Sequence, residues 1–153
     1  MPYISKMERP MLNSLLSAIQ RYPDWKEEEH HYITMNMLYD WLIIKEQENP
    51  EGIDGIINYI CTRLLKHIHG KESLRDSATA INELLNYRFE RMKQSYFNYQ
   101  RVYGLLSLME VEFDRRGWAT PQTRTVLKNE KAKWKIKIGR YEDTKIEANG
   151  DVE

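Results

Sequence analysis

The sequence predicts an all-α protein, a helical bundle followed by a polar C-terminal tail. Two observations carry this prediction. Apolar residues recur three or four positions apart over most of the 153 residues, which places them on one face of a helix. Proline and glycine, which interrupt helices, are scarce in the middle of the chain, where Gly104 is the only example of either between Ser73 and Gly117.

The first two helices are bounded by prolines. A helix is predicted over about residues 9–21, because Pro10 suits a first turn and Pro23 follows the end. A second helix is predicted over about residues 24–48. It opens with acidic side chains, which stabilise the positive end of the helix dipole, and Pro50 follows its end.

The clearest helix lies in residues 53–68, where aliphatic side chains form one stripe and Gly70 closes the helix. Ser73 is then predicted to cap a further helix, with an acid three positions on. From about residue 74 to 116, large side chains recur at near-heptad spacing. This stretch is either one long helix, which would offer a dimer seam, or two helices broken near Gln94 that pack antiparallel.

Residues 131–139, KAKWKIKIG, do not follow the helical pattern. Charged and apolar residues alternate strictly, which is the period of a strand and would place Lys133, Lys135 and Lys137 on one face. The chain offers no evident partner strand. Two alternatives remain open: an extended arm that pairs with another chain, or a helix whose lysines extend their charged groups into solvent.

Composition and charge restrict the classes of function. The formal net charge is zero, yet residues 124–140 hold seven basic residues and one acid, so the remainder of the chain sums to −6. One cysteine, Cys61, excludes an intramolecular disulfide and a cysteine-based zinc site. No apolar run is long enough to cross a bilayer, and the N-terminus lacks the apolar core of a secretion signal, so we expect no membrane contact and a cytoplasmic location.

Three stretches resemble a known family. They are the opening MPYI, the segment INYICTRLL at residues 57–65, and the close YEDTKIEANGDV at residues 141–152. Together they are similar to an uncharacterised family of short phage and bacterial proteins with an MPYI-like start, an LNYxxTRLL-like helix and a YEDxKIxENGDVY-like tail. The matching positions, of unknown role, are Asn58, Tyr59, Thr62, Arg63, Tyr141, Glu142, Asp143, Lys145, Asn149, Gly150 and Asp151.

The resemblance implies a small helical protein of the cytoplasm, that of the host if the chain is phage-encoded, and it implies no activity. The chain departs from the family pattern in a basic insert at residues 117–139 and in Glu153, where the pattern favours an aromatic residue. We expect one helical domain over residues 1–140 and a polar tail over 141–153.

The basic insert is the best candidate for a binding site. Lysines can neutralise phosphates while an interleaved tryptophan stacks on an exposed base, and this pattern predicts nucleic-acid binding. An acidic protein surface, in the same molecule or in a neighbouring copy, is the alternative target. The candidate residues are Lys133, Trp134, Lys135, Lys137 and Arg140.

Catalytic and metal-binding motifs are absent from the sequence. Glu110 and Asp114 are four residues apart on a predicted helix, a spacing that can hold magnesium, but two arginines adjoin them and favour a solvated, partly paired face. No phosphate loop, nucleophile turn or cofactor fingerprint occurs. The sequence therefore favours a non-enzymatic protein that acts through protein contacts or self-association. Nucleic-acid binding is the alternative, and a metal-dependent nucleotide hydrolase comes third.

Overall fold

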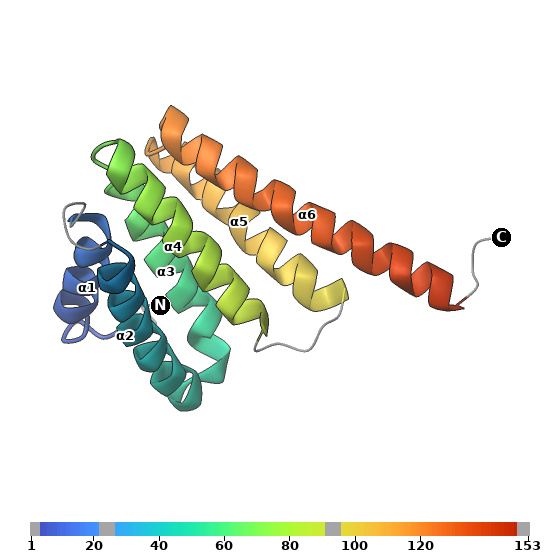
Figure 1. Ribbon diagram of the computed structural model, residues 1–153, viewed down its shortest axis with the longest axis horizontal. Coiled ribbons are helices and arrows are strands. Elements are labelled where there is room, and N and C mark those ends of the chain that lie inside the picture. Colours follow the sequence, from blue (N-terminus) through green and yellow to red (C-terminus); the bar gives the residue numbers. More distant parts are fainter. Residues whose placement is uncertain (1–3, 22–26, 91–95, 150–153) are drawn as a thin grey trace. The chain divides into compact units, whose positions relative to one another are not determined.

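The structure, a computed structural model, describes residues 4–21, 27–90 and 96–149, and these ranges contain helices and no strand (Figure 1). The all-α prediction is therefore confirmed. The helices are α1 (Arg9–Arg21), α2 (Glu27–Glu48), the short 3₁₀ helix η1 (Pro50–Gly52), α3 (Ile53–Lys66), α4 (Lys71–Glu90), α5 (Tyr96–Arg116) and α6 (Pro121–Asn149). No helix in the described ranges combines the length and the apolar content that a membrane span requires.

The chain divides into two compact units, unit 1 (residues 1–81) and unit 2 (residues 82–153). The boundary falls inside α4, so one helix contributes to both units. The single domain expected over residues 1–140 stays a prediction.

Unit 1 is built on α1, α2 and α3, which contact one another around an aliphatic core. Most of the predicted stripe of α3 is confirmed, since Ile53, Ile56, Ile57, Ile60 and Leu64 are all buried. The helix ends at Lys66, so Ile68, the last residue of the predicted stripe, lies beyond it and is half-buried. Gln20 supplies a polar link inside this core: its buried side-chain Nε2 donates to the Leu64 carbonyl at 2.7 Å and to the Ser77 Oγ at 2.9 Å. These two bonds tie the end of α1 to α3 and to the first half of α4.

The start of α4 differs from the prediction. The helix begins at Lys71, and the Gly70 carbonyl accepts the first helical bond, from the Leu74 N–H at 2.9 Å. Gly70, whose φ is 153°, therefore lies at the beginning of α4. It does not close α3, because α3 already ends at Lys66. Ser73, predicted as the cap, lies inside the first turn, where its Oγ accepts from the His69 N–H at 3.3 Å.

In unit 2, α5 and α6 form a helical hairpin (Figure 1). Gly117, with φ 71°, ends α5: the Trp118 N–H donates to the Phe113 carbonyl at 2.9 Å, and the Gly117 N–H donates to the Asp114 carbonyl at 3.2 Å. This is the Schellman pattern of bonds. Within the stretch 74–116 the described residues form α4 and α5, and the predicted break near Gln94 lies in residues 91–95, outside the described residues.

The start of α6 follows the sequence signal closely. The Thr120 Oγ1 accepts from the Thr123 N–H at 3.2 Å, and the Thr123 Oγ1 accepts from the Thr120 N–H at 2.8 Å. This reciprocal pair is a capping box in which a threonine replaces the usual glutamate. Pro121 takes the first helical position, where its missing N–H costs no hydrogen bond.

Residues 131–139, whose alternation suggested a strand, lie in the middle of α6. Of the two alternatives, the structure has the helix. On a helix the alternating lysines divide into two pairs, Lys131 with Lys135 and Lys133 with Lys137, each four residues apart on its own side. Trp134 lies between the pairs and is 1% exposed.

Candidate functional site

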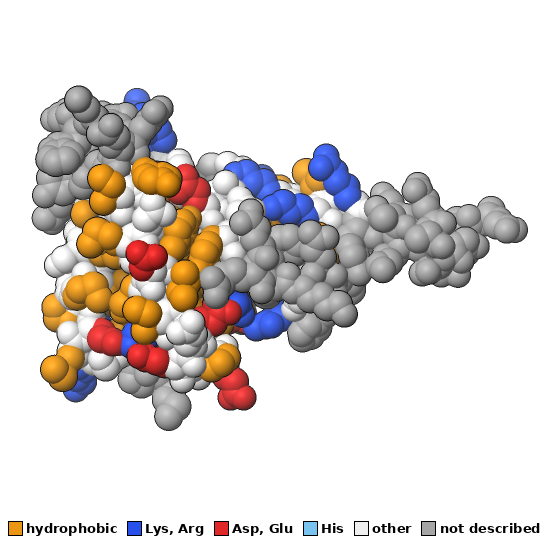
Figure 2. Space-filling view, turned by 60° about the horizontal axis from the view of Figure 1, so that its bottom comes forward, with side chains coloured by type: hydrophobic (Ala, Val, Ile, Leu, Met, Phe, Trp, Pro, Cys, Tyr) orange, Lys and Arg blue, Asp and Glu red, His pale blue; other side chains and the backbone are white. Residues whose placement is uncertain are grey.

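Helix α2 is apolar on two opposite faces. Met35, Leu38 and Leu42 are buried in unit 1. On the other side, Ile33, Met37 and Ile44 are exposed by 58%, 57% and 52%. Figure 2 shows hydrophobic side chains gathered on one face, with acidic side chains among them. A surface helix of a globular protein normally turns polar residues to solvent, so this second apolar face is unusual.

The outer apolar residues follow the spacing of a helix-packing seam. Residues 33, 37, 40 and 44 are separated by four, three and four positions, so their side chains lie in one line along α2. The third position of the line is Asp40, an exposed carboxylate with no hydrogen-bond or ion-pair partner among the described residues. We call these four residues the α2 outer face.

A cation anchors the end of α2 beside this face. The Lys45 Nζ forms an ion pair with Glu8, the residue just before α1, and a second one with the Glu48 carboxylate at 3.1 Å. The same Nζ lies 5.7 Å from the centroid of the Trp41 ring. The bond to Glu8 raises the pKa of Lys45 against the opposing effect of desolvation, and the bond to Glu48 adds to this rise. Lys45 is therefore engaged within unit 1.

The predicted nucleic-acid-binding residues are distributed over different sides of α6. The Lys137 Nζ donates to the Asn86 Oδ1 at 2.8 Å and lies 4.1 Å from the centroid of the Trp134 ring. The Lys133 Nζ pairs with the buried Glu130 at 3.0 Å. The Trp134 indole is buried and its ring centroid lies 6.5 Å from that of Tyr99, so it is not open to a base in this structure.

Lys135 and Arg140 of the same predicted set are exposed. Lys135 belongs to a stripe on the α5 side of α6, in which basic residues recur every three or four positions. The stripe consists of Arg124, Lys128, Lys131 and Lys135.

This stripe lines a hollow of about 400 Å³ in unit 2, together with Tyr103 and other residues of α5. The Arg124 guanidinium pairs with Asp114 at 3.2 Å, and the Lys131 Nζ pairs with Glu110 at 3.0 Å. Lys128 and Lys135, which also line the hollow, have no ion-pair partner among the residues that the structure describes. Within the described part of the chain, the hollow therefore carries two positive charges that no carboxylate pairs with.

Glu110 and Asp114, the carboxylates spaced for magnesium, are each paired with a cation of α6. Within the described ranges, no group of three or more His, Cys, Asp and Glu side chains could hold a metal ion. The two carboxylates therefore function here as part of the contact between α5 and α6.

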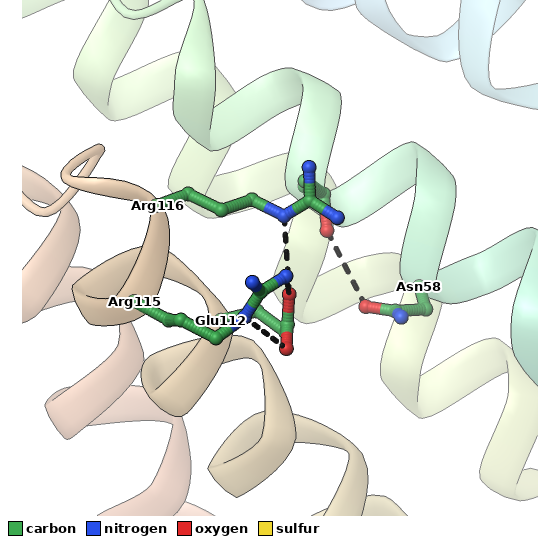
Figure 3. Close-up of polar contacts among 5 residues, drawn as sticks. Asn58, Glu112, Arg115 and Arg116 are labelled. Atoms are coloured by element: carbon green, nitrogen blue, oxygen red, sulfur yellow. Dashed lines mark hydrogen bonds and ion pairs between the residues drawn. The ribbon is translucent and has the colours of Figure 1, made fainter.

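A second charged cluster lies near the end of α5. Figure 3 shows Glu112 with the guanidinium groups of Arg115 and Arg116. The Arg115 Nη2 lies 2.9 Å and the Arg116 Nε 3.1 Å from the Glu112 carboxylate. Hydrogen bonds from Arg115, then from Arg116, lower the pKa of Glu112 to about 2. All three side chains are on one helix at the surface, so the cluster stabilises the last turns of α5 and is not shaped to bind a ligand.

The family-motif residues of α3 make local contacts. The Thr62 Oγ1 donates to the Asn58 Oδ1 at 3.3 Å (Figure 3), and the Tyr59 hydroxyl donates to the Asn13 Oδ1 of α1 at 2.9 Å. The Arg63 Nη1 lies 3.3 Å from the His67 Nε2. Burial, followed by the charges of Arg63 and Lys66, lowers the pKa of His67. These contacts account for the polar side of α3 in terms of packing within unit 1.

The structure describes the motif positions of the tail only in part. The backbone of residues 141–149 continues α6, which contains Tyr141, Glu142, Asp143, Lys145 and Asn149. The side chains of these residues, and Gly150 and Asp151 altogether, lie outside the described residues. Their role stays a prediction.

Sequence reasoning did not single out the α2 outer face. The signal was present: over residues 33–44, apolar side chains occupy too many positions to fit on one side of a helix. Reading that excess as two faces would have identified Ile33, Met37 and Ile44 as surface residues.

The comparisons with known proteins identify the family alone. A family model described as a domain of unknown function (DUF6899) matches residues 1–152, nearly the whole chain, and the chain belongs to that family. No curated protein and no solved structure matches the chain.

Proposed function

We propose that this member of the DUF6899 family is a non-enzymatic, cytoplasmic protein that acts through protein–protein contacts made by the α2 outer face. The observation that carries the proposal is the exposure of Ile33, Met37 and Ile44 in one line on a helix whose opposite side is already buried. Apolar side chains in one exposed patch lose contact with water when a partner covers them, and such patches mark interaction sites. The resemblance of the termini and of α3 to phage proteins supports a phage-encoded origin as part of the same proposal.

The spacing supports a helix or a flat apolar surface as the matching element. Side chains four, three and four positions apart form the kind of ridge that packs into the groove of another helix. Met37 at the centre adds an adaptable side chain, which tolerates small differences in the shape of the partner. A polar or charged substitution at the centre should therefore remove binding without unfolding unit 1.

The test is a photo-crosslink from the centre of the face. A benzophenone amino acid replaces Met37, and a matched variant carries it at Thr125, an exposed residue on α6. Both variants are expressed in the source cell, irradiated and analysed by mass spectrometry. We expect position 37 to give protein adducts, either with this chain or with another protein, and we expect position 125 not to give them. Absence of any specific adduct from position 37 would overturn it.

A second candidate function is binding of single-stranded nucleic acid in the hollow of unit 2. Its support is the pair of unneutralised lysines, Lys128 and Lys135, that line the hollow. Phosphate contacts of this kind make affinity fall with salt, with a log–log slope of roughly −0.7 per neutralised phosphate for single strands. Trp134 takes no part in this version, because it is buried.

The test of the second candidate is fluorescence anisotropy with labelled single-stranded DNA and RNA at several salt concentrations. The double reversal K128E/K135E should abolish binding, while K6E/K71E, which changes the net charge equally at exposed positions of unit 1, should leave most of it. Equal loss in both variants would indicate a general charge effect and contradict a site in the hollow.

A further inference from the structure

The α2 outer face has a property that limits what can cover it. Asp40 lies within the line formed by Ile33, Met37 and Ile44, and it has no ion-pair partner among the described residues. A partner that covers the apolar residues must also approach this carboxylate. Burying a carboxylate without a partner is costly, so a fitting surface brings a positive charge to Asp40.

This requirement argues against the pairing of two α2 helices. In a two-fold symmetric contact the same patch meets itself, so the Asp40 carboxylates of the two copies would lie close together. Like charges that face each other across a contact destabilise it. The other positions of the α2 outer face are apolar and supply no cation.

A complementary surface is present on α6. Lys128, Ala132 and Lys135, which line the hollow, are exposed there at a spacing of four and three positions, with Ile136 beside them. All four are exposed, Ile136 by 56%. We call these residues the α6 outer face. Ala132 is small enough to let another helix approach closely, while Ile136 is a large apolar side chain that is turned mainly to solvent.

The two outer faces match in spacing and in charge. The first three positions of each line are spaced by four and then three residues, and the third is Asp40 on α2 and Lys135 on α6. Neither of these two side chains has an ion-pair partner within the described residues. Ile136, next to Lys135, supplies an apolar side chain for the apolar residues that flank Asp40.

The distribution of charge over the chain agrees with this match. Residues 1–81 hold nine basic and twelve acidic residues, a net charge of −3, and residues 82–153 hold fourteen and eleven, a net charge of +3. A chain with zero net charge and opposite charges on its two units attracts other copies of itself when unlike units meet. Two different faces in contact can join copies head to tail, or can meet twice, reciprocally, in a two-fold dimer.

We propose that the α2 outer face binds the α6 outer face of a second copy of this chain, with Asp40 paired to Lys135 of that copy. This inference rests on the proposed function and names its partner. Because each copy carries one face of each kind, the contact either repeats from copy to copy or is made twice, reciprocally, in a two-fold dimer.

The experiment is analytical ultracentrifugation of the full chain over a range of concentrations, with a charge-swap design. The wild-type chain should show an average mass that rises with concentration and falls with added salt. D40K alone places two lysines opposite each other, and K135E alone places two carboxylates opposite each other, so each variant should associate about tenfold more weakly. Both residues are exposed, so both variants should keep the wild-type circular dichroism and melting temperature.

An equimolar mixture of the two variants is the decisive sample. In it, Asp40 of the K135E chain meets Lys135 of the D40K chain. The lysine introduced at position 40 likewise meets the carboxylate introduced at position 135, so every contact in an alternating assembly joins opposite charges. Association should return to within about twofold of the wild type. The chain carrying both substitutions should also associate, while E51K and K6E, reversals outside both faces, should behave as the wild type does.

Three results would overturn the inference: a wild-type chain that stays monomeric at every concentration, association that neither reversal weakens, or a mixture that fails to restore it. Each of these is compatible with a crosslink from position 37 to a different protein, which would leave the proposed function standing. Absence of any adduct from position 37 would instead remove both.

Discussion

The rings of Phe113 and Trp118 meet edge to face, with their centroids 5.9 Å apart and their planes at 87°. The two residues lie on either side of the turn that ends α5, where an apolar contact commonly accompanies a Schellman motif. The Arg116 guanidinium lies 5.1 Å from the centroid of the Trp118 ring. This contact, together with the two backbone bonds around Gly117, determines where α5 stops and hence where α6 begins to return along it.

Gly117→Ala should therefore destabilise the protein by about 1–2 kcal/mol, because an L-residue with a positive φ brings its Cβ close to the backbone. Gly104→Ala is the matched control: this glycine lies within α5, and an added Cβ would meet no atom within 4 Å. The control should gain about 0.5–1 kcal/mol through helix propensity. Guanidinium denaturation of both variants measures the difference, and equal effects would contradict the assigned role of Gly117.

The strand-like alternation of residues 131–139 shows where sequence periodicity is insufficient. Charged and apolar residues at alternate positions fit a strand locally, but α6 is capped at Thr120 and continues as a helix well past this stretch. Inside a long helix, the packing of a single large side chain outweighs the local pattern. Trp134 takes the core position next to Tyr99, and the lysines on either side reach partners or solvent.

Trp134→Ala should thus cost about 3–5 kcal/mol of stability, as expected for removing a large buried aromatic side chain. Ile136→Ala, two positions away but 56% exposed, should change stability by less than about 0.5 kcal/mol. Thermal or chemical denaturation distinguishes the two. On a strand both side chains would share a face, so comparable losses would be evidence against the helical arrangement.

The buried polar link of unit 1 gives a further prediction. Gln20→Leu removes the donor to the Leu64 carbonyl and the Ser77 hydroxyl, and it should cost about 1–3 kcal/mol. Adding Ser77→Ala should recover part of that loss, because the hydroxyl that lacks a donor is then gone as well. The control Gln100→Leu changes an exposed glutamine of α5 and should be nearly neutral. A double mutant as unstable as the sum of its single mutants would indicate that the two residues do not interact.

The existence of the helices was largely predictable from the sequence, and the exposed faces of α2 and α6 were not. Capping residues, prolines and the stripe of α3 act within a few residues of one another, so their spacing is informative on its own. The α2 outer face is different, because which of two apolar sides is buried depends on where α1 and α3 lie. Similarly, only the pairing of Arg124 and Lys131 with acids of α5 distinguishes these residues from Lys128 and Lys135.

Glu112 provides a prediction in pH. Its carboxyl has a folded-state pKa of about 2, below the ordinary value of 4.5, because Arg115 and then Arg116 donate to the charged form. The unfolded chain therefore binds the proton more readily than the folded one does. The stabilisation from this cluster is complete above about pH 4.5 and is lost as the pH falls towards 2.

Carboxyl carbon shifts measured by NMR should accordingly show Glu112 titrating well below the ordinary glutamate value of 4.5. Glu112→Gln should remove this contribution, so the variant and the wild type should differ in stability at neutral pH and converge as the pH falls to about 2, where half of the wild-type carboxylates are protonated. Arg115→Lys, which keeps the charge but not the two-pronged hydrogen bonding seen here, should raise the pKa of Glu112 towards its ordinary range. A wild-type Glu112 that titrates near the ordinary value of 4.5 would contradict the geometry of the cluster.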